Sequence, residues 1–148
     1  MGEVALQLEY SVEADASPGF SWNYWTDVTN WEDPPAQFLL NGPFAAGSRG
    51  TTLMPGQEPV RWTIREVRTG ESYVLEMLLD GAVLSFEWHF AAMSDRKTRL
   101  TQRIVLSGNN AAAHAAGIEA GFGPTLPEGM KRIAGLLARA EARARGAG

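Results

Sequence analysis

The sequence predicts an α+β fold, in which a curved antiparallel sheet of about seven strands wraps around a long C-terminal helix. Short segments with alternating apolar and polar residues fill most of the region 37–106, as half-buried strands do. Turn residues separate these segments, which is typical of an antiparallel meander. From residue 126 onward apolar residues recur at helical spacing, so one long helix has an apolar face that can cover the concave side of the sheet.

The first expected elements are a strand and two short helices. Apolar residues occupy alternate positions over 4–12, which indicates a strand with one buried face. Ser17 followed by Pro18 matches the N-cap and the first position of a helix, so we expect a helix from Pro18 to Asp27. A second short helical turn is expected to end near Trp31.

Six further strands are expected in the central region. Asp80-Gly81 is a strong two-residue hairpin signal between two of them. Asn41-Gly42-Pro43, Pro55-Gly56 and Thr69-Gly70 mark other turns. The expected strands cover residues 38–40, 49–53, 60–65, 73–79, 84–90 and 99–106.

Two helices are expected toward the C-terminal end. The Ala-rich segment from Ala111 to Ala120 predicts a short helix, which the glycines and the proline after it would end. Thr125 and Glu128 then match a capping box, in which both side chains satisfy free N–H groups at a helix start. The apolar face of the last helix is expected to consist of Leu126, Met130, Ile133, Leu137 and Ala140.

Composition limits the class of protein. The 148 residues fit one domain over 1–148, and 45% hydrophobic with 20% charged residues is ordinary globular composition. A formal net charge of −4 argues against nucleic acid as a partner. Because there is no cysteine, disulfides, zinc–thiolate sites and cysteine nucleophiles are excluded.

The chain also lacks the usual membrane and export signals. No apolar run is long enough for membrane insertion, and no signal-peptide pattern opens the sequence, so we expect a cytoplasmic protein. A homodimer is compatible with a domain of this size, although no residue marks an interface.

Several turns and aromatic positions resemble a known family. They are Trp25-Thr26-Asp27-Val28-Thr29-Asn30-Trp31, Asn41-Gly42-Pro43-Phe44 with Gly47-Ser48, Leu79-Asp80-Gly81-Ala82 with Phe86 and His89, and Thr98-Arg99-Leu100-Thr101-Gln102 with Ser107-Gly108. Together with the order of the elements, they resemble the helix-grip fold of the START-like (SRPBCC) superfamily, the fold of birch pollen allergens. Within it the chain is similar to the bacterial polyketide cyclase/dehydrase and lipid-transport family.

The resemblance implies a cavity between the sheet and the C-terminal helix. The first hypothesis is that this cavity binds a small hydrophobic ligand, either a lipid or a polyketide-like molecule. The alternative is a polyketide cyclase/aromatase or dehydratase acting in the same cavity. A third is an interaction module whose cavity is collapsed, because one fold carries many functions. No Gly-rich phosphate loop or dinucleotide motif is present, so no cofactor is expected.

The inward stripes of the strands and of the last helix supply the candidate cavity walls. Bulky aromatic and flexible methionine side chains among them suit an irregular apolar ligand. The same residues could instead fill the interior completely, and then no ligand site would exist. The candidate ligand-binding residues are Trp62, Ile64, Tyr73, Leu75, Met77, Leu84, Phe86, Trp88, Leu100, Gln102, Ile104, Met130, Ile133 and Leu137.

Gln102 and Tyr73 are the two candidates for a catalytic role. Gln102 shares a strand face with Leu100 and Ile104, so its amide should point inward, where an unsatisfied group costs about 1–3 kcal/mol. Its partner is either a ligand or an internal group such as Tyr73, a backbone atom or a water. Tyr73 brings a phenol either to the cavity or to its rim. Relatives often carry histidine in place of Gln102, and glutamine cannot transfer protons as histidine does.

The two histidines offer weaker sites. His89 and Glu87 lie two apart on one strand face and could form an acid–base pair, but the opposite face is apolar, so we expect both to face solvent. Arg61 and Arg65 are expected on the outer face too, as partners for carboxylates. His114, close to the expected cavity mouth, is expected to be a lone surface residue, so no metal site is predicted.

Overall fold

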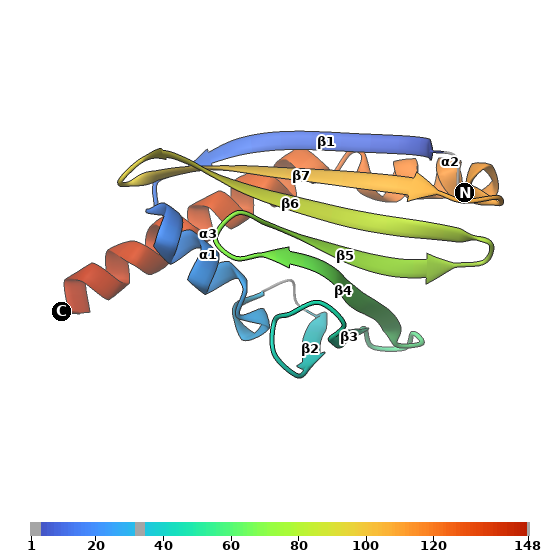
Figure 1. Cartoon of the computed structure of the whole chain (residues 1–148), viewed down its shortest axis with the longest axis horizontal. Helices are drawn as coiled ribbons and strands as arrows, with labels where there is room; N and C mark the ends of the chain where they lie inside the picture. Colours follow the sequence, from blue (N-terminus) through green and yellow to red (C-terminus); the bar gives the residue numbers. More distant parts are fainter. Residues whose placement is uncertain (1–3, 32–34, 148) are drawn as a thin grey trace.

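A computed structural model describes residues 4–31 and 35–147 (Figure 1). It confirms the predicted fold class, a seven-stranded antiparallel sheet with a long C-terminal helix. The strands are β1 (Val4–Ala14), β2 (Gln37–Asn41), β3 (Arg49–Leu53), β4 (Val60–Arg68), β5 (Ser72–Leu79), β6 (Ala82–Ser94) and β7 (Lys97–Ser107). The helices are α1 (Pro18–Trp25), the 3-10 turn η1 (Val28–Asn30), α2 (Ala111–Phe122) and α3 (Leu126–Ala147).

The strand order in the sheet is β1-β7-β6-β5-β4-β3-β2. Every strand after β1 therefore pairs with its neighbour in sequence, as short turns dictate, while β1 closes on β7. The predicted hairpin between β5 and β6 forms at Asp80-Gly81, where Gly81 has a positive φ of 70° that glycine adopts without strain. The meander expected from the turn residues is thus confirmed.

The helices all cover one face of the sheet. Figure 1 shows α3 crossing behind the strands, with α1 beside it on one side and α2 toward the other end. The long helix packs against β1, β7 and α1, so its contacts lie near one edge of the sheet. The central strands β4 to β6 make few contacts with α3. Within 4–31 and 35–147, no helix is long and apolar enough to cross a bilayer.

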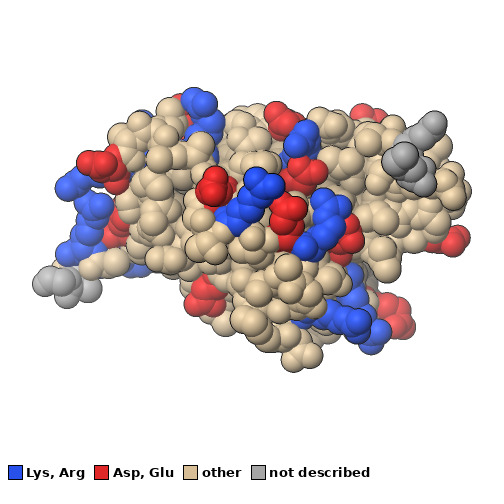
Figure 2. Space-filling view, in the orientation of Figure 1, with Lys and Arg blue, Asp and Glu red and all other residues tan. Residues whose placement is uncertain are grey.

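The opposite face of the sheet carries charge. Figure 2 shows Lys and Arg interleaved with Asp and Glu over the middle of this face. The shortest ion pairs between neighbouring strands here join Arg65 to Glu76 at 2.7 Å and Arg103 to Glu87 at 2.9 Å. His89 is also exposed on this side. The outward orientation expected for Glu87, His89 and Arg65 is therefore confirmed.

The buried side chains form two apolar clusters. The larger lies beneath α1 and α3 and includes Trp22, Leu100 and Leu137. The smaller lies beneath α2 and includes Leu84 and Leu106. The buried apolar side chains are thus divided between the two ends of the sheet.

A buried carboxylate ties α1 to α3. Ser17 caps α1 as predicted, because its hydroxyl accepts a hydrogen bond from the Phe20 N–H. The Ser17 hydroxyl and backbone N–H both donate to Glu141 of α3, at 2.6 and 3.0 Å. Burial raises the pKa of Glu141, but the Ser17 hydrogen bonds and the nearby Arg145 charge outweigh it and hold the pKa below its usual value.

This carboxylate should make stability depend on acidity. A folded-state pKa below the unfolded value of about 4.3 gives stability that is present above that value and is lost as pH falls through the folded pKa. In urea unfolding, the wild type should therefore lose stability as the pH falls from about 7 to about 3. Glu141→Gln should be less stable than the wild type at neutral pH and should lose less stability on acidification. Glu119→Gln makes the same charge change at an exposed position and should follow the wild type. An equal acid sensitivity of all three proteins would contradict the assignment.

Candidate ligand-binding cavity

A cavity of about 340 Å³ lies between the concave face of the sheet and α3. Strands β2 to β7 supply one wall, and α3 supplies the other. The end of α1, the residue after η1 and the end of α2 close the sides. The lining residues are Trp25, Trp31, Phe38, Thr52, Trp62, Tyr73, Leu75, Met77, Phe86, Trp88, Gln102, Ile104, Phe122, Thr125, Leu126, Gly129, Met130, Arg132 and Ile133.

Most of the residues that the sequence nominated form part of this wall. Alternation along the strands correctly placed them on the concave face, and helical spacing placed two on the inner face of α3. Their binding role stays a prediction. The nominated residues in the wall are Trp62, Tyr73, Leu75, Met77, Phe86, Trp88, Gln102, Ile104, Met130 and Ile133.

Four nominated residues do not line the cavity. Ile64, Leu84, Leu100 and Leu137 face inward as expected, but each is at most 1% exposed and packs into the apolar clusters instead. The physical reason is their position along the elements: Leu84 lies under α2, and Leu100 and Leu137 belong to the cluster beneath α1 and α3. Facing the interior is therefore not sufficient for reaching the open space.

Other wall residues were not nominated, although some had a signal. Phe38 is the inward-facing aromatic of the predicted short strand β2. Gly129 interrupts the apolar face of the last helix and leaves a gap there. Trp25, from the end of α1, belongs to the wall. Trp31, Thr52, Phe122, Thr125, Leu126 and Arg132 also line the cavity.

Tryptophan rings form a connected wall. The Trp25 ring lies 5.6 Å from Trp88 and 5.5 Å from Trp31, and Trp31 in turn lies 5.7 Å from Trp62. Two of these indoles are fixed by hydrogen bonds. Trp31 Nε1 donates to the Trp25 carbonyl at 2.7 Å, and Trp62 Nε1 donates to the Thr52 hydroxyl at 3.1 Å. The rings therefore present a preformed aromatic surface, and a bound ligand does not have to order it.

Gln102 contributes an amide to the wall. It stands on β7 between Tyr10 of β1 and Trp88 of β6, and it is half-buried. The structure therefore confirms its inward orientation. A half-buried amide at the wall of a cavity can donate to, or accept from, a molecule that enters.

Tyr73 and Trp25 carry buried polar atoms without partners. Tyr73 is 1% exposed and Trp25 is 7% exposed, and neither the phenol Oη nor the indole Nε1 forms a hydrogen bond. The Tyr73 hydroxyl is thus fully buried, and not at the rim. Burial raises the pKa of Tyr73, and hydrogen bonding with the Trp25 side chain opposes this only in part, so the phenol is neutral at ordinary pH.

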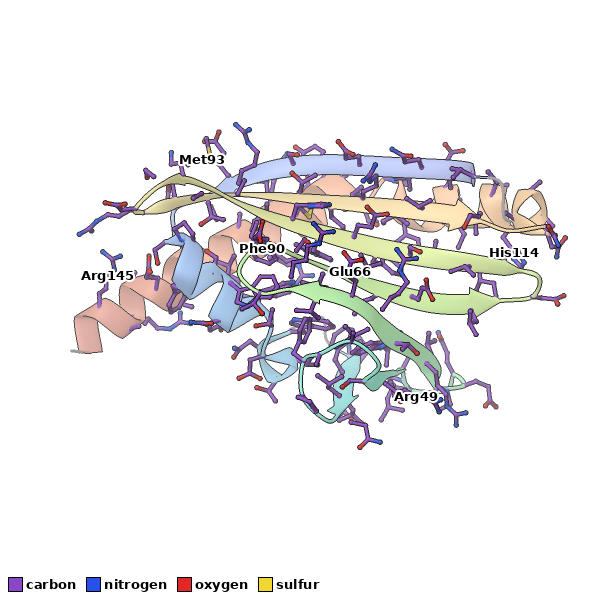
Figure 3. The ribbon with its side chains drawn as sticks, in the orientation of Figure 1. Arg49, Glu66, Phe90, Met93, His114 and Arg145 are labelled. Atoms are coloured by element: carbon purple, nitrogen blue, oxygen red, sulfur yellow. The ribbon has the colours of Figure 1, made fainter. Side chains whose placement is uncertain are left out.

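The histidines lie away from this wall. The His114 Nε2 is 3.0 Å from the Asp80 carbonyl, and Figure 3 shows it at the end of the β5–β6 hairpin. It belongs to the surface of α2 and is no part of the cavity wall. Within the described ranges, no group of three or more His, Cys, Asp or Glu side chains could hold a metal ion.

The arrangement of sheet and helices is the helix-grip fold, as the sequence predicted. No protein-family model and no curated protein matches the sequence.

Solved structures share the architecture. An aromatase/cyclase, ZhuI from Streptomyces sp. R1128, has a TM-score of 0.69 at 18% identity, with 97% of this chain and 98% of that chain covered. Norcoclaurine synthase from Thalictrum flavum in complex with dopamine and hydroxybenzaldehyde has 0.68 at 11%, with 97% and 88% covered. Ara h 8.0201 has 0.69 at 13%, with 91% and 98% covered. Identities this low show a common fold alone.

Proposed function

We propose that this chain binds a small hydrophobic molecule, of lipid or polyketide type, in the cavity between its sheet and α3. The observation that carries the proposal is the connected aromatic wall around about 340 Å³ of free space. Binding sites for small molecules are concave and mostly apolar, with a few polar groups and volumes of about 300–1,000 Å³. Gln102, Thr52 and Thr125 supply polar groups of that kind.

The wall favours binding over proton-transfer catalysis. A general acid or base works best when its pKa lies near the operating pH. Among the described lining residues the titratable side chains are Tyr73 and Arg132, and burial moves the Tyr73 pKa further from neutrality. The Gln102 amide does not titrate. A carrier or receptor role needs none of these groups to move a proton.

The second candidate is a cyclase or aromatase in the same cavity. It is favoured by fold likeness to an aromatase/cyclase and to norcoclaurine synthase. Such an enzyme would use the cavity walls to hold a chain folded for ring closure, with Gln102 and Tyr73 orienting its carbonyl groups. Gln102→Ala should then abolish cyclised product from a polyketide-like substrate while leaving the affinity for inert apolar ligands unchanged.

Gly129→Leu should abolish binding and leave the fold intact. A Cβ at Gly129 meets no atom within 4 Å, and the residue lines the cavity, so the new side chain would occupy the ligand space. Replacing a helical glycine also favours α3 by up to about 1 kcal/mol. We expect affinity for the neutral fluorescent probe N-phenyl-1-naphthylamine to fall by at least about tenfold, with unfolding stability equal or higher.

Gly135→Leu is the matched control. Gly135 lies on the same helix but outside the cavity wall, and a Cβ there would meet only the mobile end of Arg139. Gly135→Leu should stabilise α3 by the same amount and should bind the fluorescent probe with wild-type affinity. Native mass spectrometry of freshly purified protein should in addition show a hydrophobic molecule bound to the wild type and absent from Gly129→Leu. Equal probe binding by both variants would refute the cavity site.

A further inference from the structure

The wall of the proposed binding cavity carries a single charge. Arg132 of α3 is the only charged side chain among the described residues that line the cavity, and none of those residues is a carboxylate. The rest of the lining is aromatic, aliphatic or neutral polar. A bound molecule therefore meets one place in this wall where an opposite, negative charge is attracted.

Two parallel rows of residues on α3 place this cation at the mouth of the cavity. The inner row is apolar and half-buried or buried, and it consists of Leu126, Met130 and Ile133. The outer row lies one position earlier at each step, and it consists of Thr125, Gly129 and Arg132. Both polar residues of the outer row are exposed and still line the cavity, so they mark where it opens to solvent.

Of these two polar residues, Arg132 has the donors that a ligand can use. The Thr125 hydroxyl already faces the Gly121 and Phe122 carbonyls, at 3.2 and 3.4 Å. A guanidinium carries several N–H donors in a planar fork, which matches the two oxygens of a carboxylate. Arg132 also interacts with the protein itself, and its several donors allow a ligand carboxylate to join that interaction.

The apolar interior restricts where the charge of a ligand can lie. A carboxylate placed deep against the aromatic wall would lose its hydration without an ionic partner, which is very costly. At the mouth it would meet Arg132 and keep part of its water shell. One cation balances one negative charge, whereas a phosphate monoester carries about −1.5 to −2 near pH 7. The best match is an apolar body that ends in one carboxylate.

We propose that Arg132 is an anion-recognition residue at the cavity mouth, and that the cavity selects amphipathic monocarboxylates. The apolar body would lie against the tryptophan rings, and the carboxylate would meet the Arg132 guanidinium. The inference rests on the proposed function, since it names the ligand class of the same cavity. A fatty acid and a flat polycyclic acid share this chemistry.

A matched pair of ligands tests the charge preference. 2-Naphthylacetate and 2-naphthylacetamide have nearly the same shape and differ by one negative charge at about pH 7. Calorimetric titration of the wild type at low salt should give about fivefold tighter binding of the acid, as expected for a partly exposed ion pair. About 1 M salt should bring the ratio of the two dissociation constants close to one. Decanoate and decanamide, measured in parallel, distinguish a straight lipid chain from a flat ring system.

Variants at the mouth assign the preference to one side chain. Arg132→Gln removes the charge, and it should reduce the acid-to-amide preference to about one with unchanged affinity for the amide. Arg132→Lys restores the charge without the planar fork and should keep a preference of about twofold. Arg132→Glu should make the amide the tighter ligand. Because the ratio is measured, general effects of a variant on cavity shape cancel.

Lys131→Gln is the matched control. It makes the same charge change at the next position of α3, at an exposed residue outside the cavity wall, and should keep the wild-type ratio. A preference that falls as much in Lys131→Gln as in Arg132→Gln would mean diffuse attraction by α3 and would overturn the assignment to Arg132.

The outcomes separate the anion site from the proposed function. Equal affinity of the wild type for acid and amide, or a preference that Arg132→Gln leaves unchanged, overturns the anion site and leaves the apolar cavity site standing. If neither naphthalene compound binds, and Gly129→Leu does not change the affinity for N-phenyl-1-naphthylamine, both the anion site and the cavity site are wrong.

Discussion

Trp88→Ala is expected to lower the free energy of unfolding by about 3–5 kcal/mol, the usual cost of deleting a buried aromatic side chain. Trp88 is 5% exposed and stands at the centre of the aromatic wall. Its ring lies 5.6 Å from Trp25, 6.1 Å from Tyr73 and 6.3 Å from Phe90. Deletion would leave three rings facing a void, because rigid neighbouring strands cannot collapse into it. Urea unfolding followed by circular dichroism measures the loss without depending on tryptophan fluorescence.

Leu78→Ala is the control for this substitution. Leu78 lies on the outer face of β5 and is 77% exposed, so truncation there removes little buried area and should change stability by at most about 0.5 kcal/mol. A Trp88→Ala protein that unfolds within about 1 kcal/mol of the wild type would show that the wall is not packed as described.

Gly50→Val should destabilise the sheet by about 3 kcal/mol, at the upper end for overpacking, and narrow the cavity. Gly50 of β3 pairs with Trp62 of β4, and any Cβ at Gly50 would overlap three carbons of the Trp62 ring. The indole cannot easily move away because it is bonded to Thr52 and tilted against Trp31. Displacement toward the cavity should weaken ligand binding together with stability. Chemical denaturation and probe titration measure the two effects on one protein.

A double-mutant cycle isolates this contact. In a Trp62→Leu background, the ring that clashes with valine is gone, so Gly50→Val should lose most of its cost. The coupling between the two positions should then exceed about 1 kcal/mol. Additive effects would mean that valine at position 50 disturbs the strand by another route.

Side-chain alternation was sufficient to predict the sheet. It fixed the inward face of β5, β6 and β7, because shifting a strand by one residue exposes its whole apolar set. The positions of Gln102 and His89 followed from the same alternation, one toward the cavity and the other toward solvent. Local turn chemistry at Asp80-Gly81 fixed one hairpin. These features depend on residues close in sequence, so the sequence alone contains them.

The extent of the cavity was harder to predict. Leu100 and Gln102 face the same way on β7, yet Leu100 is buried in the cluster beneath α1 and α3, whereas Gln102 lines the cavity. The position at which a helix stops packing against a sheet depends on the helix–sheet crossing angle and on the curvature of the sheet. No short sequence pattern encodes either quantity. The same holds for Phe122, which reaches the wall by packing edge-on at 5.5 Å against Phe86.

The pairing of β1 with β7 has a consequence for how the chain reaches its native state. Val12 and Leu100 are register partners, although the whole meander separates them in sequence. The first strand cannot find its only neighbour in the sheet until the last strand exists, and closing so long a loop is entropically costly. We therefore expect slow folding dominated by non-local pairing, with β1 docking late. During synthesis on the ribosome, the apolar face of β1 would stay exposed until the other strands are made. We therefore expect chaperones to bind this strand.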